Sequence, residues 1–208
     1  CNGQWHSASF EDAQVLVKKA EGGYQNDDRD NGNYTGGKIG VGTQIGTNFG
    51  IAAPTLKEYL GYEPSANDMK KLTYSTAVDI YKKMYWNKIN GNDIKSQKLA
   101  NMIYDGSVNH GVGGIKGFVN DILGLKSYNL AKINTSNPDW LFNEIGKKRK
   151  EWYNKRGGYA IESWLDRLKK LGYSGLEYVG GMKLTTKIIL GVGVISALGG
   201  GIYLLMKK

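Results

Sequence analysis

Two carboxylates near the N-terminus, Glu21 and Asp30, have the residue types and the spacing that acid and base chemistry at a glycosidic bond requires. Glu21 stands directly before Gly22-Gly23-Tyr24, and Asp30 follows nine residues later in a polar loop rich in glycine. Glycosidases hold one carboxylic acid and one carboxylate on opposite sides of the bond that they cleave. The pair is therefore a candidate acid and base.

The residues before Glu21 predict a helix that positions it. Ser9 followed by Asp12 resembles a capping box, and apolar residues recur at helical spacing as far as Ala20. Gly22-Gly23 then favours a left-handed helix end. A carboxyl in the last turn lies at the negative end of the helix dipole, which raises its pKa toward the range of a general acid. An ordinary solvated glutamate at a helix end is the alternative.

Five motifs follow one another along the chain. They are Phe10-Glu11-Asp12-Ala13, Glu21-Gly22-Gly23-Tyr24 with Asn26-Asp27 and Asp30-Asn31-Gly32, Thr47-Asn48-Phe49-Gly50-Ile51, Tyr85-Trp86, and Asp105 leading into Val108-Asn109-His110-Gly111. In this order they resemble glycoside hydrolase family 108, the bacterial and phage N-acetylmuramidases. A weaker likeness to the C-terminal peptidoglycan-binding part of that family continues through Trp152-Tyr153 and Trp164-Leu165, to about residue 177.

The resemblance implies a lysozyme-like peptidoglycan hydrolase that cleaves the β-1,4 bond between N-acetylmuramic acid and N-acetylglucosamine, in phage lysis as an endolysin or in wall remodelling. Glu21 would be the general acid. Asp30 would stabilise the oxocarbenium-like transition state, or help Thr47 to position a water. The distance between the carboxyls, about 6.5–9.5 Å for inversion and about 5–5.5 Å for retention, cannot be taken from a sequence.

Two threonines are candidates for the third position of the site. Thr47 directly precedes the Asn-Phe-Gly-Ile motif of the family, and we prefer it on that ground. Thr35 is closer by count to the threonine of phage-type lysozymes, a more distant resemblance. Asp27 and Asp28 are likewise alternatives to Asp30, although their types also suit an ordinary polar turn.

Four residues are predicted to bind substrate: Tyr24, Trp86, Asn109 and His110. Aromatic rings hold sugars by stacking on their apolar faces, and the amide and imidazole supply hydrogen bonds. A core position for Trp86 and a structural role for His110 are the alternatives. Two histidines and one cysteine give no metal-ligand spacing, and the glycine-rich stretch lacks a phosphate-binding ending, so neither a metal nor another cofactor is predicted.

The rest of the chain predicts mostly helices. A short β-hairpin is predicted within the glycine-rich residues 32–50, where Lys38-Ile39-Gly40-Val41-Gly42 alternates, as one wall of a cleft. A loop without fixed shape is the alternative for the hairpin, because glycine weakens strands. The fold class expected is mostly α: a lysozyme-like α+β fold with a small β-hairpin, plus a C-terminal transmembrane helix. The predicted helices span residues 9–21, 54–60, 75–86, 96–108, 112–123, 137–152 and 161–171.

The C-terminal tail predicts a single-pass membrane anchor. Residues 188–206 carry no charge, and a helix of that length at about 1.5 Å per residue nearly spans the lipid bilayer core of about 30 Å. Lysines at both ends leave the orientation open. Gly193, Ala197 and Gly201 are four residues apart, a pattern that favours a homo-oligomer of membrane helices, unless they simply face lipid.

We therefore expect a catalytic region at residues 1–111, a helical peptidoglycan-binding-like region at 112–178 packed on it, and a transmembrane helix at 184–206. The net charge of +9 favours anionic wall polymers and lipid headgroups, whereas no nucleic-acid recognition signature is present. Cys1 is either a processed end or a fragment boundary. A lytic transglycosylase that uses Glu21 alone, and a non-catalytic wall-binding or secretion-assisting protein, are the alternative functions.

Overall fold

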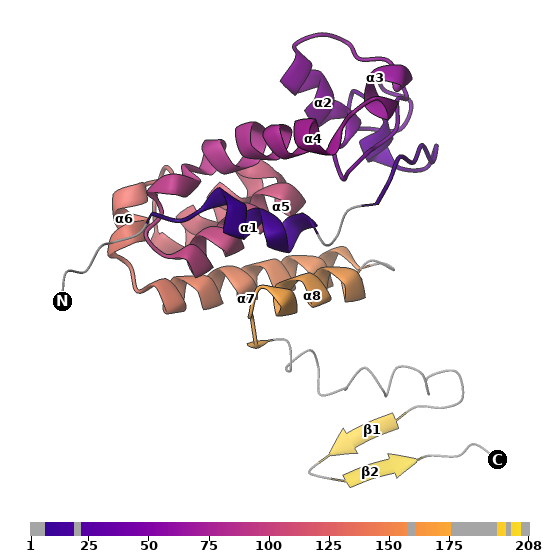
Figure 1. Cartoon of the computed structure of the whole chain (residues 1–208). Helices are drawn as coiled ribbons and strands as arrows, with labels where there is room; N and C mark the ends of the chain where they lie inside the picture. The colour runs from indigo at the N-terminus through magenta and orange to yellow at the C-terminus, as the bar shows by residue number, and fades with distance from the viewer. Residues whose placement is uncertain (1–6, 19–21, 158–160, 176–194, 199–200, 205–208) are drawn as a thin grey trace. The chain divides into compact units, whose positions relative to one another are not determined.

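The structure is a computed structural model that describes residues 7–18, 22–157, 161–175, 195–198 and 201–204 (Figure 1). The chain divides into two compact units, Cys1–Arg149 and Lys150–Lys208, and each is described by itself. The described chain is mostly helical, with few strands. The predicted division after residue 111 stays a prediction, and one long helix runs across that position.

The secondary structure of the first unit begins with α1 (Phe10–Lys18), the 3-10 turn η1 (Asn31–Asn33), α2 (Ala53–Leu60), α3 (Ala66–Lys70) and α4 (Tyr74–Tyr81). It continues with the π-helical turn η2 (Lys82–Trp86), the 3-10 turns η3 (Asn87–Ile89) and η4 (Gly91–Asp93), α5 (Gln97–Leu123), α6 (Leu130–Thr135) and α7 (Pro138–Arg156), whose last residues belong to the second unit. The second unit also holds α8 (Ile161–Lys170) and the strands β1 (Ile195–Leu198) and β2 (Gly201–Leu204).

Polar side chains set the starts of several helices. Ser65 and Asp68 form a reciprocal capping box at α3, and the side chains of Thr73 and Ser96 accept backbone N–H groups at the starts of α4 and α5. These bonds satisfy donors that the first helical turn leaves without partners. The predicted helix starts near residues 75 and 96 are therefore confirmed to within about two residues, the ordinary uncertainty of a helix end.

The helical body is the part of the first unit that holds α1, η2, α5 and α7 as far as Arg149. Its core is built on three aromatic rings. Phe10 of α1, Trp86 of η2 and Tyr104 of α5 meet edge to face, with ring centroids 5.5–5.9 Å apart. All three are buried. Gly91 approaches the indole so closely that a Cβ there would lie 2.3 Å from the ring. A residue larger than glycine at position 91 would therefore displace Trp86.

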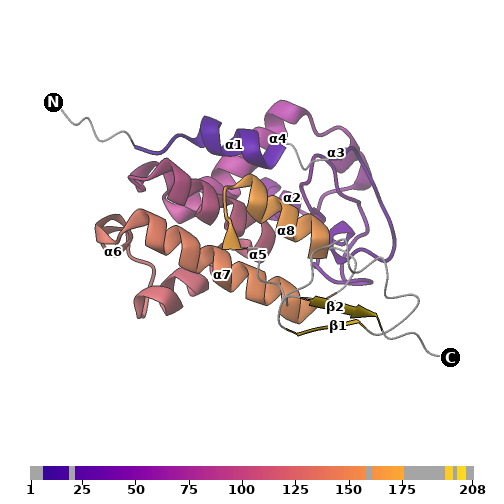
Figure 2. The same ribbon diagram turned by 90° about the horizontal axis from the view of Figure 1, so that it is seen from below.

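The helix α1 lies along α5 and runs parallel to it (Figures 1 and 2). The backbone N–H of Ser9 donates to Gln97 Oε1 over 2.6 Å at the start of both helices. One turn and a half further on, the Tyr104 hydroxyl donates to the Gln14 side chain. With a rise of about 1.5 Å per residue in both helices, the end of α1 lies at about the level of residue 108 of α5.

The turn η2 connects two different cores. Just before it, the Tyr81 hydroxyl donates to the carbonyl of Phe49 over 3.2 Å, in the lobe formed by residues 22–73. At its end, Trp86 packs in the helical body against Phe10 and Tyr104. Figure 1 shows α4 leaving the lobe and running along the helical body. The wider π-helical turn therefore stands where the chain passes from one core to the other.

The predicted β-hairpin is not a regular strand pair. Residues 22–52 contain isolated bridges instead: Gln25 with Thr47, Tyr34 with Gln44, Lys38 with Val41, and Asn48 with Ile51. Glycine weakens strands because it adds backbone entropy and no packing surface, and this loop is rich in it. Its shape is held by short turns and, as shown below, by side chains.

The predicted transmembrane helix at residues 184–206 is wrong, and the expected fold class is corrected accordingly to a mostly helical chain with few strands. Within the described part of the chain, no helix is both long and apolar enough to cross a membrane. Residues 195–198 and 201–204 form antiparallel strands, with Ile195 opposite Leu204. Glycine and β-branched residues, which are common in this segment, have low helix propensity. A single-pass anchor in a lipid bilayer therefore has no support.

The predicted oligomer contact loses its basis with the helix. Ala197 lies opposite Ile202, and Gly201 lies opposite Leu198, in the paired strands. They therefore do not share one helix face, which the small-residue pattern requires. Gly193 lies outside the described residues.

The described part of the second unit has an aromatic core of its own. Tyr153 of α7 stacks on Trp164 of α8, with ring centroids 5.2 Å apart, and Trp152 meets Tyr153 edge to face at 5.7 Å. Tyr153 and Leu168 are buried. These contacts account for the aromatic residues of this region as packing. The resemblance to a peptidoglycan-binding part stays a prediction.

Candidate active site

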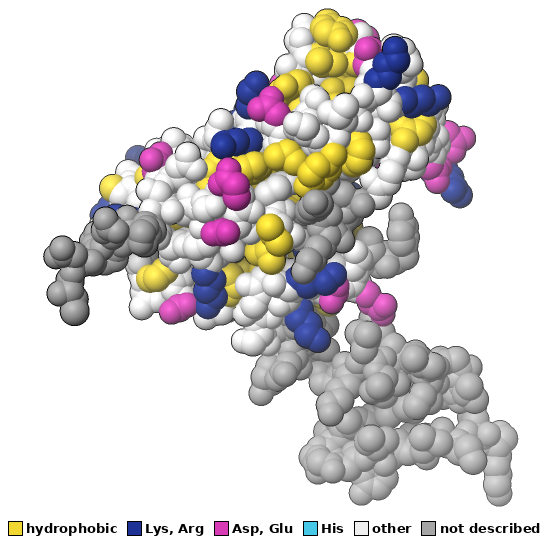
Figure 3. Space-filling view, viewed as in Figure 1, with side chains coloured by type: hydrophobic (Ala, Val, Ile, Leu, Met, Phe, Trp, Pro, Cys, Tyr) yellow, Lys and Arg dark blue, Asp and Glu magenta, His cyan; other side chains and the backbone are white. Residues whose placement is uncertain are grey.

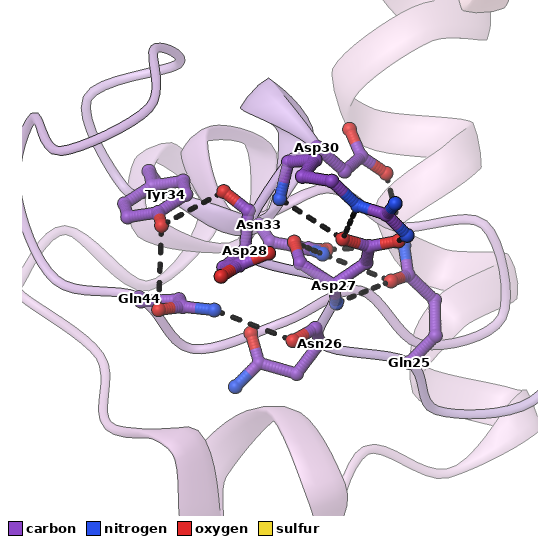
Figure 4. A network of polar contacts seen from close by, with 9 residues as sticks. Gln25, Asn26, Asp27, Asp28, Asp30, Asn33, Tyr34 and Gln44 are labelled. Atoms are coloured by element: carbon purple, nitrogen blue, oxygen red, sulfur yellow. Dashed lines mark hydrogen bonds and ion pairs between the residues drawn. The ribbon is translucent and has the colours of Figure 1, made fainter.

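The side chain of Asn33 is the centre of a polar network in the loop of residues 22–52 (Figure 4). Its Oδ1 accepts hydrogen bonds from Gln25 Nε2 over 3.1 Å and from the Thr47 hydroxyl over 2.7 Å. Its Nδ2 donates to Gln25 Oε1 and to the carbonyl of Asp27. Asn33 is fully buried, so this one amide fixes three segments of the loop relative to one another.

Asp30 belongs to the same network. Its Oδ2 accepts from Gln25 Nε2 over 3.0 Å, and its Oδ1 accepts from the backbone N–H of Gly32 over 2.9 Å, which caps η1. The carboxylate is exposed, yet both of its oxygens are oriented by donors. A Cβ built on Gly32 would lie 3.3 Å from Asp30 Oδ1 and 3.8 Å from Thr47 Oγ1. The loop therefore brings the predicted base and the preferred threonine to the same glycine.

The two candidate threonines have different surroundings. Thr47 is half-buried, pairs with the backbone of Gln25 and donates its hydroxyl to Asn33. Thr35 is buried, and its hydroxyl is hydrogen-bonded to Glu63 while it also accepts from the N–H of Thr43. Of the two threonines, Thr47 is thus the one whose side chain joins the network of Asp30.

The alternative aspartates have other contacts. Asp27 accepts from the guanidinium of Arg29 over 2.7 and 2.9 Å, and these hydrogen bonds hold the pKa of Asp27 far below its usual range. Asp28 contributes its backbone carbonyl, which accepts from the Tyr34 hydroxyl over 3.0 Å. Figure 4 shows Asp30 on the side of the loop where Gln25 meets Asn33.

Tyr24 is held between two neighbours. Its hydroxyl donates to the carbonyl of Ile45 over 3.3 Å, and a Cβ on Gly46 would lie 2.7 Å from its ring. The ammonium of Lys70 lies over the ring, 5.2 Å from its centroid. A cation at that distance is attracted to the ring face. Tyr24 therefore packs against the loop on one part of its ring and against a lysine on another.

Trp86 does not contribute to an accessible site. None of its side chain is exposed, and its Nε1 donates to Asn92 over 2.7 Å. Its rings contact the aromatic core described above. Stacking on a sugar requires an open ring face, so the predicted substrate-binding role of Trp86 is not supported by its placement, and the structure corresponds to the alternative of a core residue.

Asn109 and His110 are anchored by a buried ion pair. Asp105 and Arg149, exposed by 2% and 0%, approach to 2.5 Å. Asn109 Nδ2 donates to the carbonyl of Asp105 over 2.8 Å, and Arg149 Nε donates to His110 Nε2 over 3.2 Å. Because Nε2 accepts this bond, the neutral imidazole carries its proton on Nδ1. Both predicted residues are half-buried, and their described contacts are within the helical body.

The Val108-Asn109-His110-Gly111 motif stands at a kink of α5. Gly111 has φ 73° and ψ 157°, outside the helical region, where glycine carries no steric penalty. The end of α1 lies at about the same level, as shown above. Glu21, the predicted general acid, lies outside the described residues, three positions beyond the end of α1.

Asn33 and Gln25 are the residues that the sequence did not indicate. They bring Asp30 and Thr47 together, although they stand 8 residues apart and Thr47 lies a further 14 from Asn33. Their types are common in polar loops, and the loop path alone brings them into contact. Within the described ranges, no group of three or more His, Cys, Asp or Glu side chains is arranged to hold a metal ion.

The comparisons with known proteins define the class of this chain as a glycoside hydrolase. Residues 15–111 match the family model described as Glycosyl hydrolase 108. The resemblance drawn from the five motifs is confirmed in this part. The matched range includes the whole polar loop and ends at the Gly111 kink.

A solved structure supports the same assignment. The structure of SagA from Brucella abortus is 26% identical to this chain and superimposes with a TM-score of 0.64. The similarity covers 78% of this chain and 90% of that one. No curated protein matches this chain.

Proposed function

We propose that this glycoside hydrolase cleaves peptidoglycan as an N-acetylmuramidase, with Glu21 as general acid and with Asp30 and Thr47 on the water side of the bond. The observation that carries the proposal is the network through Asn33 and Gln25, which joins the side chains of Asp30 and Thr47. Two groups that act on one water must be held at a fixed separation, and this network holds them.

The hydrogen-bond directions suit that role. Thr47 donates its proton to Asn33 Oδ1, so the lone pairs of the Thr47 oxygen are left to accept a proton from water. Asp30 accepts from Gln25 and Gly32 and presents an exposed carboxylate. In the proposed reaction, Glu21 gives its proton to the glycosidic oxygen as the bond to the anomeric carbon breaks. A water then adds to that carbon and gives a proton to Asp30.

The experiment compares the release of soluble fragments from purified peptidoglycan by the full chain and by its Glu21→Gln, Asp30→Asn and Thr47→Val variants, with product ends identified by mass spectrometry. Reducing muramic acid ends from the wild type, lost in Glu21→Gln and reduced at least tenfold in Asp30→Asn, are expected. Thr35→Val is the matched control and should keep more activity than Thr47→Val, because Thr35 contacts Glu63 instead of the network.

Two results would contradict the proposal. Anhydro ends in place of reducing ends would assign the cleavage to a lytic transglycosylase. Full activity of folded Glu21→Gln would remove the general acid from Glu21.

A further inference from the structure

We propose that Lys70 selects an anionic glycan at this site, by binding a carboxylate that the substrate carries on the lactyl group of muramic acid or on the attached peptide. This inference rests on the proposed function, because it deepens the substrate preference of the same site. It concerns a residue outside the five family motifs and outside the acid and base chemistry.

The first observation is the pairing of Lys70 with Tyr24. The ammonium lies 5.2 Å from the centroid of the Tyr24 ring, and the ring also packs closely on Gly46. The ring thus has Lys70 over its face and Gly46 close to its edge atoms. Tyr24 is adjacent in sequence to Gln25, which binds Asp30 and pairs with Thr47. The ring therefore places the lysine at the edge of the candidate site.

The second observation is that α3, the helix that carries Lys70, is fixed to the site. Asn48, the residue after Thr47, is buried and donates from Nδ2 to the carbonyl of Met69 over 3.0 Å. Met69 is itself fully buried. At its other end α3 has the Ser65 and Asp68 capping box. Lys70 thus extends from a backbone whose position is set by the Thr47 motif.

The third observation is the charge around Lys70. In the lobe, Lys57 is paired with Glu63 at 2.5 Å, and in the neighbouring turn Lys83 is paired with Asp79 at 3.0 Å. Lys38 and Lys71 resemble Lys70, because no described acidic side chain forms an ion pair with them, but neither lies over the Tyr24 ring. Among the described residues, no acidic side chain forms an ion pair with Lys70. Figure 3 shows Lys and Arg side chains gathered over the part of the lobe where Figure 1 places α3. Its charge is therefore available to a ligand.

Glycan chemistry makes a carboxylate the fitting partner. In peptidoglycan, the lactyl carboxyl of muramic acid is bound to peptide, and the peptide carries free carboxylates. After the peptide is removed by an amidase, the lactyl carboxylate itself is free. An exposed ammonium and a carboxylate attract only weakly, so we expect about a threefold change in affinity, which is about 0.65 kcal/mol. Lys70 would therefore tune substrate preference and leave the chemical step unchanged.

The test compares the full chain with its Lys70→Gln, Lys70→Arg and Lys116→Gln variants. Lys116 is the matched control because its ammonium also lies over a tyrosine, 4.9 Å from the Tyr128 ring, and its loss changes the net charge equally. The substrates are intact peptidoglycan, amidase-stripped glycan, and peptidoglycan whose carboxylates have been converted to amides with carbodiimide and methylamine. Steady-state rates and co-sedimentation with the insoluble substrates are both measured.

The expected result is a rise in KM of about threefold for Lys70→Gln on carboxylate-bearing glycan, with kcat unchanged and with no difference from wild type on the amidated substrate. Lys70→Arg should resemble wild type, and Lys116→Gln should match it. An effect confined to intact peptidoglycan assigns the carboxylate to the peptide, and an effect on stripped glycan assigns it to the lactyl group. Both outcomes support the proposal.

The inference is overturned if Lys70→Gln and Lys116→Gln behave alike, or if Lys70→Gln is impaired equally on amidated substrate. Binding separates this outcome from a failure of the proposed function. If wild type releases no fragments, the enzymatic proposal fails, and co-sedimentation still decides whether Lys70→Gln loses affinity for the carboxylate-bearing glycan. If all four proteins release fragments with the same kcat and the same KM, the muramidase proposal stands and the role of Lys70 is refuted.

Discussion

The helical body and the polar loop of residues 22–52 are held together by different forces. In the body, Phe10, Trp86 and Tyr104 are buried against one another, and apolar burial acts without direction, in proportion to the area removed from water. In the loop, Asn33 makes four side-chain hydrogen bonds, each of which requires one partner in one orientation. The difference means that the apolar core and the proposed catalytic geometry lie in separate regions of the chain.

The largest expected effect is a loss of stability when the aromatic core of the helical body is disrupted. Trp86→Ala should lower the free energy of unfolding by about 3–5 kcal/mol, because a fully buried indole is replaced by a cavity. Urea unfolding followed by circular dichroism measures the change. Trp140→Ala is the control, since that side chain is 46% exposed and its loss should cost about 0.5 kcal/mol or less. Equal losses in the two variants would mean that Trp86 does not carry the core.

Disrupting the polar network of the loop should cost less stability but should strongly reduce the proposed activity. Asn33→Ala removes two hydrogen bonds with the Gln25 amide, one with the carbonyl of Asp27 and one with the Thr47 hydroxyl, so we expect about 1–3 kcal/mol of destabilisation. Release of peptidoglycan fragments should nevertheless fall at least tenfold, because Asp30 and Thr47 lose their common support. Unfolding curves and rates on the same samples test this order of effects.

Asn67→Ala, in the exposed part of α3, is the control for that variant. It should keep both stability and activity. If Asn33→Ala lost as much stability as Trp86→Ala, or kept the activity of the wild type, the different roles assigned to the helical body and the loop would be wrong.

The smallest effect concerns pH and one contact at the edge of the loop. Hydrogen bonds from Lys57 and then Thr35 lower the pKa of Glu63 from 4.5 to about 2. A carboxylate whose pKa is lowered by folding stabilises the protein above its unfolded pKa, and this contribution is lost as the pH falls from about 4.5 toward 2. Melting temperatures between pH 7 and pH 2.5 should therefore show a gap between wild type and Glu63→Gln that narrows below pH 4.5.

Adding Glu63→Gln to Lys57→Gln should lower the melting temperature less than adding it to wild type. The reason is that Lys57→Gln already removes the largest cause of the lowered pKa of Glu63. A gap that stayed constant across the range would show that Glu63 acts through its shape and not its charge.

Much of the helical body could be predicted from the sequence, because its signals are local. Apolar periodicity and caps such as Ser96 gave the starts of α4 and α5 and both ends of α8 to within about two residues, whereas α5 runs on through the break expected after residue 108. The short helices α3 and α6 were missed, since five or six residues carry too little periodicity. The tail was predicted wrongly because an uncharged run fits a membrane helix by length, whereas residues 195–198 and 201–204 pair as strands.

The site was predicted less completely. The motifs indicated Asp30 and Thr47 individually, but no spacing rule relates either residue to Asn33 or Gln25, whose contacts depend on the path of the loop. Trp86 illustrates the opposite error, because an aromatic motif in a family of sugar-binding enzymes is equally well explained by a core. Lys70 left no signal at all in the sequence, since its proposed role depends on the ring above which it lies.

The π-helical turn at Lys82–Trp86 makes chain length itself a constraint. Tyr81 faces the lobe and Trp86 faces the helical body, so the number of residues between them sets the rotation of one packing face relative to the other. In an α-helix each residue turns the chain by about 100°, since there are about 3.6 residues per turn. Removal of a single residue here would point either Tyr81 or Trp86 away from its core. Natural insertions and deletions should therefore be excluded from this turn, while the exposed Lys38–Val41 turn can change in length.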